Sequence, residues 1–334
     1  MNAPEKPKPP HACTLGSLDH PTSAWNRAAA ATEQGDPFCC RTEWHISFHE
    51  AYGPRRPTHL CAHGDNVLAF AEQRYADLGI VLQSLESMWF FGSPILGEDA
   101  VPLLDAFLAH HAKTGFRPCV LLSGLLPGSK LLRDLERTLG RRYQFLPLEP
   151  RVQSSASLDG GLDGFLSRRS GSWRRNLKQA ARRAAERGVT FERHAPRHPA
   201  EAAETYRRML AVEWKSWKGL GTCGMEEPNS SQFYSTMLRR LAESGGGRVM
   251  FARHEGADIG FIFGGMAGAN YRGQQFSYAE EWRKASIGNL LQVEQVRWLS
   301  EEGAVRYDMG PLMDYKPHWT EQQITIERRV LVPK

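Results

Sequence analysis

The chain has 334 residues, enough for two domains, and its hydrophobic and charged fractions of 41% and 24% are typical of a globular protein. No apolar run approaches the roughly 20 residues of a transmembrane helix, and residues 1–13 lack the apolar core of a signal peptide. We therefore expect a soluble, cytoplasmic protein without membrane insertion. The net charge of +5 is local, because residues 168–187 contain eight basic residues and one glutamate.

The cysteines and histidines do not form a metal-binding pattern. Six cysteines are present without a C-x-x-C pair, and the adjacent Cys39 and Cys40 suit neither a disulfide nor a zinc site. His45 and His49 are four residues apart, but no third ligand is evident. We expect reduced thiols and no bound metal.

The first half of the chain alternates between predicted helices and strands. Residues 1–35 are expected to be a disordered lead-in, and Trp44, Phe48 and Tyr52 then follow at helical spacing. The later elements are strands at 59–62, 66–72 and 80–83, a helix at 99–113, a strand at 119–122 and a helix at 129–139. Together they predict a mixed α/β domain over residues 36–151.

The second half repeats the same kinds of element. Residues 152–164 begin with a stretch rich in Ser, Gly and Asp, so we expect a linker there and a second α/β domain over residues 165–334. The predicted elements are helices at 172–187, 202–217 and 233–241, strands at 189–192, 248–254, 258–264 and 271–279, a helix at 287–300, and strands at 304–309 and 324–332.

The start of the helix at 287–300 is a candidate site for a pyrophosphate. A helix N-terminus offers unpaired backbone N–H groups and a partial positive charge, which together favour anions. Gly288 permits close approach of a ligand to the backbone, and Arg283 and Lys284 add positive charge. Most helix starts of this composition bind nothing, so this segment alone is a weak signal.

A second candidate cluster follows the strand at 304–309. It contains Asp308, Tyr315 and Lys316, and strand ends of this kind often bind ligands in α/β sheets. Tyr315 could transfer a proton, and Lys316 could stabilise a developing oxyanion. The alternative is a surface loop with a solvated lysine and a packed tyrosine.

Tryptophan and arginine side chains leave further alternatives open. We expect Trp214 and Trp217 to lie in the core. The alternative is that they line an acceptor pocket, because aromatic faces suit sugars and apolar chains. Arg174, Lys178 and Arg182 share one helix face, which would be a solvated surface, a site for a phosphorylated acceptor, or an RNA-binding surface.

Several segments in order resemble the CelD/BcsL-type acyltransferases of the GNAT superfamily, also called BioF2-like. The matching segments are Arg174-Arg175-Asn176-Leu177, Phe233-Tyr234, Ser286-Ile287-Gly288-Asn289, Asp308-Met309-Gly310-Pro311 and Tyr315-Lys316-Pro317-His318-Trp319. The resemblance covers about residues 35–320. The family itself is distantly similar to the Fem-type aminoacyltransferases. It implies an α/β fold of two tandem GNAT-like lobes, each a mixed, largely antiparallel sheet flanked by helices.

The resemblance also implies roles for particular residues. Acyl-CoA would be bound by Arg283, Lys284, Ser286, Ile287, Gly288 and Asn289, with its arm between the strands at 271–279 and 304–309. Lys316, Tyr315 and Asp308 would be catalytic, and Trp214, Trp217, Arg175 and Tyr278 would bind substrate. The chain departs from the family at Ile287, where proline is usual, and at Gly288, which is a single glycine in place of a fuller glycine pattern. Leu312-Met313 replaces the usual small or acidic pair, and this replacement suggests a more apolar acceptor or acyl pocket.

The implied reaction is direct attack by an amine or hydroxyl on an acyl thioester. The acceptor would be a small molecule, a sugar or a glycan precursor of the cell envelope, and Asp308, Glu280 or Glu281 would accept its proton. The sequence has no recognisable Ser-His-Asp pattern, so we do not expect a covalent enzyme intermediate. The alternatives are a Fem-like enzyme that uses aminoacyl-tRNA, and a non-catalytic binding protein of GNAT shape.

Overall fold

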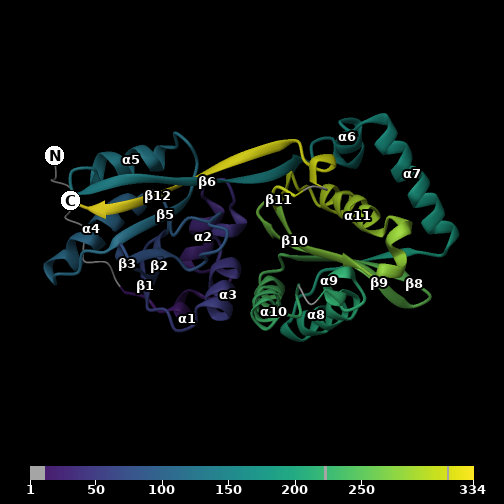
Figure 1. Cartoon of the computed structure of the whole chain (residues 1–334), viewed down its shortest axis with the longest axis horizontal. Coiled ribbons are helices and arrows are strands. Elements are labelled where there is room, and N and C mark those ends of the chain that lie inside the picture. Colours follow the sequence, from purple (N-terminus) through teal and green to yellow (C-terminus); the bar gives the residue numbers. More distant parts are fainter. Residues whose placement is uncertain (1–11, 222–223, 314–315) are drawn as a thin grey trace. The chain divides into compact units, whose positions relative to one another are not determined.

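A computed structural model describes residues 12–221, 224–313 and 316–334, in which helices flank twelve sheet strands (Figure 1). Its contacts divide the chain into two units, which are Met1–Val152 with Ile324–Lys334, and Gln153–Gln323. Most of the strand pairs whose register is described are antiparallel, and the parallel ones among them are β3 with β5 and β10 with β11. The expected fold class, two mixed and largely antiparallel α/β lobes flanked by helices, is confirmed.

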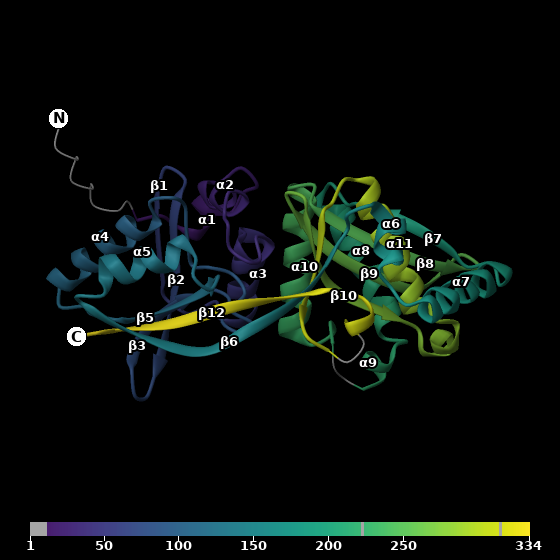
Figure 2. The same cartoon turned by 90° about the horizontal axis from the view of Figure 1, so that it is seen from above.

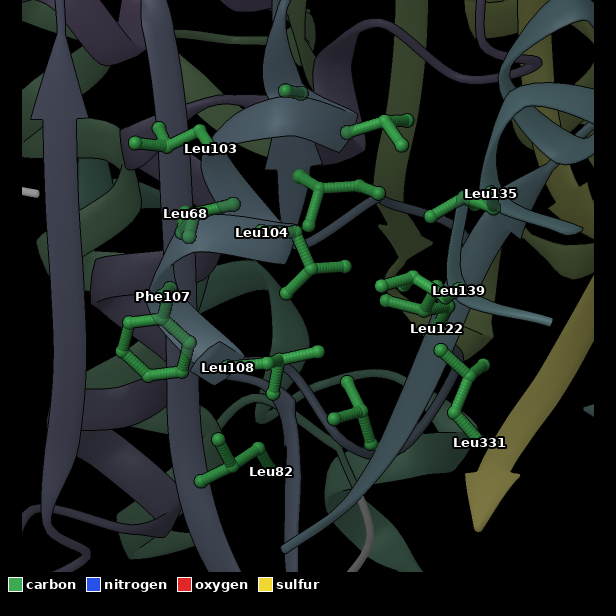
Figure 3. Close-up of a cluster of buried hydrophobic side chains, with 14 of the residues drawn as sticks. Leu68, Leu82, Leu103, Leu104, Phe107, Leu108, Leu122, Leu135, Leu139 and Leu331 are labelled. Atoms are coloured by element: carbon green, nitrogen blue, oxygen red, sulfur yellow. The ribbon is translucent and has the colours of Figure 1, made fainter. Parts of the chain in front are cut away.

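The first unit has the strand order β1-β2-β3-β5-β12-β6, with β4 paired to β2, and it contains β6 (Tyr143–Ser157) as far as Val152. Its strands are β1 (Thr58–His63), β2 (Asn66–Tyr75), β3 (Gly79–Ser84), β4 (Ile95–Leu96), β5 (Cys119–Leu125) and β12 (Gln322–Pro333). Its helices are α1 (Leu15–Leu18), α2 (Ala24–Ala30), η1 (Phe38–Cys40), α3 (Thr42–Tyr52), α4 (Ala100–Lys113) and α5 (Lys130–Leu139). Leucines of α4, α5 and the strands, with Phe107, form a buried cluster in it (Figure 3).

The expected disorder of residues 1–35 is wrong for the part that the structure describes. Residues 12–35 contain α1 and α2, and the indole of Trp25 is fully buried. Its Nε1 donates a hydrogen bond of 2.8 Å to the carbonyl of Cys40. Thr14 and Ser23 cap the two helices, so local capping and one large buried ring order a segment whose composition is polar.

The domain limits differ from the expected ones in two places. The predicted linker, residues 152–164, contains the end of β6 (Tyr143–Ser157) and the start of α6 (Gly161–Ser167). The last strand, β12, pairs with β5, so residues 324–334 group with the first unit. Alternation along one strand does not reveal its distant partner, which is why the sequence predicted neither feature.

The second unit has the strand order β6-β11-β10-β9-β8-β7. Its strands after β6 are β7 (Thr190–His194), β8 (Gly247–His254), β9 (Ala257–Ala267), β10 (Asn270–Tyr278) and β11 (Arg306–Pro311). Its helices after α6 are α7 (Gly171–Glu186), α8 (Pro199–Glu213), α9 (Trp217–Leu220), α10 (Pro228–Glu243), η2 (Glu280–Ala285), α11 (Ile287–Glu301) and η3 (Lys316–His318). Figures 1 and 2 show α6, α7 and α11 on one side of this sheet and α8 and α10 on the other.

Helix α11 packs closely on the centre of this sheet. A β-carbon at Gly260 of β9 would come within 3.0 Å of the side chains of Ile287 and Leu291, so glycine is required for the contact. Cys40, Cys61 and Cys119 are free thiols, and Cys223 lies outside the described residues. None of the described helices is long and apolar enough to cross a membrane.

Candidate active site

Strands β10 and β11 of the second unit are joined over a short length only. Their parallel ladder has three residue pairs and ends at Arg272 and Asp308. Beyond that point β10 continues to Tyr278 with β9 as its partner, and β11 continues to Pro311 along β6. The two strands therefore have different partners after the ladder, and the outer edge of β10 beyond Arg272 is not joined to β11 by this ladder.

A β-bulge in β11 accompanies the end of the ladder. The pairing of β11 with β6 shifts between Asp308 and Gly310. Gly310 has a φ of +73°, a conformation that favours glycine. A bulge of this kind bends the strand and redirects its carbonyl groups, and here it is followed by the segment that leads to Lys316.

Lys316 is buried and held by the bulge. Its side chain enters the protein from η3, and the residue is only 4% exposed. The Nζ atom donates hydrogen bonds to the carbonyls of Met309 at 2.6 Å and Pro311 at 2.5 Å. Burial, and after it the positive charge of Arg272, lowers the pKa of the ammonium to about 7. The alternative of a solvated lysine is therefore wrong.

Asp308 and Arg272 lie beside this lysine in the sheet. Both residues are almost completely buried, and they are partners in the ladder between β10 and β11. An oxygen of Asp308 accepts a hydrogen bond of 2.8 Å from Arg306. A β-carbon at Gly310 would come 2.8 Å from Nη2 of Arg272, so this guanidinium lies against the bulge. Arg272 could not be predicted from the sequence, because one arginine in a strand is usually exposed.

The segment before α11 makes a tight turn onto the helix. Ser286 has a left-handed backbone, with φ of 59°, and its carbonyl accepts hydrogen bonds from the amides of Asn289 and Leu290. Ile287 is buried in the core on which α11 packs. Since the amides of the first turn lack helical partners further back, those of Ile287 and Gly288 belong to the groups that can bind an anion.

Gly288 is in contact with aromatic rings of β10. A β-carbon there would lie 3.0 Å from the ring of Tyr278 and 3.2 Å from that of Phe276. The side chains of Arg283, Lys284 and Asn289 are exposed around this turn, and Arg283 forms an ion pair of 3.3 Å with Glu280. The fold thus brings Gly288 of α11 next to Tyr278 of β10, the strand that diverges from β11.

Four of the remaining predicted residues are described by the structure as exposed. Trp214 and Trp217 are 59% and 58% exposed, so the expectation that they lie in the core is wrong. Helix α8 ends at Glu213, so both residues follow the helix whose buried face they were expected to extend. Arg175 is on the exposed face of α7, and Glu281 is exposed. Tyr315 lies outside the described residues.

The family comparison matches the part of the chain that contains these features. Residues 171–317 match the model of the family described as Acetyltransferase (GNAT) domain. This segment is therefore a domain of the GNAT type. It includes β10, β11, the turn before α11 and Lys316. Comparison with curated proteins gives no match.

Solved structures show that the fold of the whole chain is shared. A conserved protein of unknown function from Bacteroides thetaiotaomicron has 12% identity and a TM-score of 0.62, with 97% of this chain and 99% of that chain covered. FemX has 13% identity and a TM-score of 0.62, with 94% and 96% covered. L-PGS from Bacillus licheniformis has 15% identity and a TM-score of 0.54, with 94% and 92% covered. At these identities the likeness concerns the fold.

Proposed function

We propose that the GNAT domain transfers an acyl group from acyl-CoA to an amine or hydroxyl of a small-molecule, sugar or glycan-precursor acceptor. The observation that carries the proposal is the divergence of β10 and β11 beside a buried, lowered-pKa lysine. An extended donor arm can pair with the edge of β10 beyond the ladder as a further strand would. The reacting thioester would then lie near the bulge that holds Lys316.

The turn before α11 fits the phosphate end of such a donor. Gly288 lies on the rings of Phe276 and Tyr278, which belong to the same edge strand. The first-turn amides of Ile287 and Gly288 would bind the pyrophosphate, and the exposed Arg283 and Lys284 would add charge. One strand and the helix that follows it would thus bind both ends of the donor.

In the proposed reaction the acceptor's nitrogen or oxygen forms a bond to the thioester carbonyl carbon, and the carbon–sulfur bond breaks. Lys316, fixed by the carbonyls of Met309 and Pro311, donates a hydrogen bond to the oxyanion in its ammonium form. The acceptor's proton passes to a base, and the thiolate leaves and is protonated. Asp308, Glu280 and Glu281 remain the proposed bases, directly or through water.

A thermal-shift experiment tests the proposal. CoA and acetyl-CoA at millimolar concentration are expected to raise the melting temperature, because a ligand that binds only the folded state stabilises it. Adenosine at the same concentration is the control for nonspecific effects. No shift with folded protein would remove the support for an acyl-CoA donor.

A second candidate is an aminoacyl-tRNA donor, as in a Fem-like enzyme. It is favoured by the exposed cations of α7, Arg174, Lys178 and Arg182, in a helix whose apolar stripe is buried. It predicts tRNA binding that weakens steeply with salt and is lost when the three residues are replaced by glutamate. Binding that is equal at low and high salt would exclude this candidate.

A further inference from the structure

The segment between α8 and α10 brings a lysine to the free part of β10. Lys218, in α9, donates hydrogen bonds from Nζ to the carbonyl of Phe276 at 2.9 Å and to Oε1 of Gln275 at 3.0 Å. The Nζ atom is also 5.8 Å from the centre of the Phe276 ring. Both partners lie on β10 beyond Arg272, where the ladder to β11 has ended.

The register of β10 shows which edge Lys218 contacts. The amide of Ala279 donates to the carbonyl of Ile259 at 2.9 Å, so the backbone of residue 279 faces β9. In an antiparallel pair, alternate residues direct their backbone groups to opposite sides. The register is regular from Tyr278 back to Phe276, so Ser277 faces β9 as residue 279 does. The carbonyl of Phe276, one residue earlier, therefore points away from β9. Lys218 is bonded to the edge that faces β11.

Several contacts fix this lysine in place. Gln275 donates from Nε2 to the hydroxyl of Tyr234 in α10 at 2.7 Å, which orients its oxygen toward Lys218. Ser216 caps α9 by accepting a hydrogen bond from the amide of Lys218 at 3.2 Å. The carbonyl of Lys215 accepts a hydrogen bond of 2.8 Å from the amide of Glu280, at the start of η2. The segment is thus tied to both β10 and the turn before α11.

We propose that Lys218 is a donor-binding residue, whose ammonium contacts the carbonyl groups of a donor arm that runs along the outer edge of β10. This inference rests on the proposed acyl-CoA donor and adds a residue to its site. An arm with amide groups can hydrogen bond to the backbone edge and accept from the ammonium. Phe276 connects the two parts, since its carbonyl contacts Lys218 and its ring contacts Gly288.

The test compares CoA binding to the full chain and to Lys218→Met by isothermal titration calorimetry. We expect about tenfold weaker binding in Lys218→Met, because hydrogen bonds to a charged group are stronger than neutral ones. Lys218→Arg is expected to retain part of the affinity. Lys215→Met is the matched control, since Lys215 is exposed in the same segment and its backbone contact to Glu280 remains.

A second ligand separates contact with the arm from a general structural effect. Adenosine 3′,5′-bisphosphate resembles the phosphate end of CoA and lacks the arm, so Lys218→Met should bind it as the wild type does. Equal losses for both ligands, unchanged CoA binding in Lys218→Met, or tighter CoA binding would each overturn the assignment of Lys218. The proposed donor itself fails in a different way, in that the wild type would not bind CoA.

Discussion

The guanidinium of Arg272 occupies the space beside Gly310, with Nη2 2.8 Å from where a β-carbon would stand. This contact connects the last residue of the β10–β11 ladder on one strand with the bulge on the other. Because Arg272 also contributes to the lowered pKa of Lys316, the contact links the geometry of the strands to the charge of the proposed catalytic residue.

Gly310→Ala is expected to destabilise the protein more than a comparable glycine substitution elsewhere. A β-carbon at a left-handed position costs about 1–2 kcal/mol, and displacement of Arg272 adds about 1–3 kcal/mol. Gly268→Ala is the control, because Gly268 has a φ of +59° but nothing within 4 Å of its β-carbon position. Urea unfolding followed by circular dichroism measures both; equal losses would show that the Arg272 contact is unimportant.

Lys316→Met should abolish most acyl transfer. Loss of a preorganised oxyanion donor lowers kcat by about 10²–10³-fold. The melting temperature without ligand and the Kd of CoA serve as controls for folding and for donor binding. A Lys316→Met variant that folds, binds CoA and retains wild-type kcat would exclude the proposed role.

The pH dependence of kcat should show the titration of Lys316. If the ammonium is the active form, its contribution is present below about pH 7 and is lost as the pH rises through that value. Stopped-time assays over this range, at saturating donor, should show a decline that is absent in Lys316→Arg, since arginine remains charged. If an active Lys316→Arg variant shows the same decline of kcat with pH, the decline belongs to the titration of another group.

The same titration should affect stability in the opposite direction. The folded pKa of Lys316, about 7, is below its ordinary value of 10.5, so between these values the unfolded chain binds more protons. The free energy of unfolding of the wild type should therefore increase with pH across this window, relative to Lys316→Met, by at most about 1.4 kcal/mol per pH unit. Parallel profiles of the two proteins would contradict a buried lysine with a lowered pKa.

Two tryptophans test the order of the N-terminal segment. Trp25→Ala should cost about 3–5 kcal/mol, because the ring is fully buried and bonded to Cys40. Trp217→Ala should change stability by about 0.5 kcal/mol or less, because its side chain is mostly exposed. Denaturant titration compares the two; a Trp25→Ala protein as stable as the wild type would restore the expectation of disorder.

Local patterns predicted most individual elements. The helices expected at 99–113 and 287–300 are observed at Ala100–Lys113 and Ile287–Glu301, because helical periodicity is contained in neighbouring residues. The pairing of β12 with β5 and the burial of Trp25 depend on residues far apart in the chain, which periodicity does not encode.

The proposed site was predicted only in part. Gly288 and Lys316 stood out because a helix start and a strand end are common binding positions. Arg272 and Lys218 did not, since their importance arises from contacts with Gly310 and Phe276 that only the fold creates. Trp214 and Trp217 were misplaced because α8 ends before them.

The central claim is that β10, the turn before α11 and Lys316 form an acyl-CoA site. Native mass spectrometry of freshly purified protein, before and after addition of acetyl-CoA, tests it most directly. We predict a stoichiometric adduct with the mass of CoA or an acyl-CoA, displaced by excess adenosine 3′,5′-bisphosphate. A folded protein that shows no adduct at millimolar acetyl-CoA would contradict the claim.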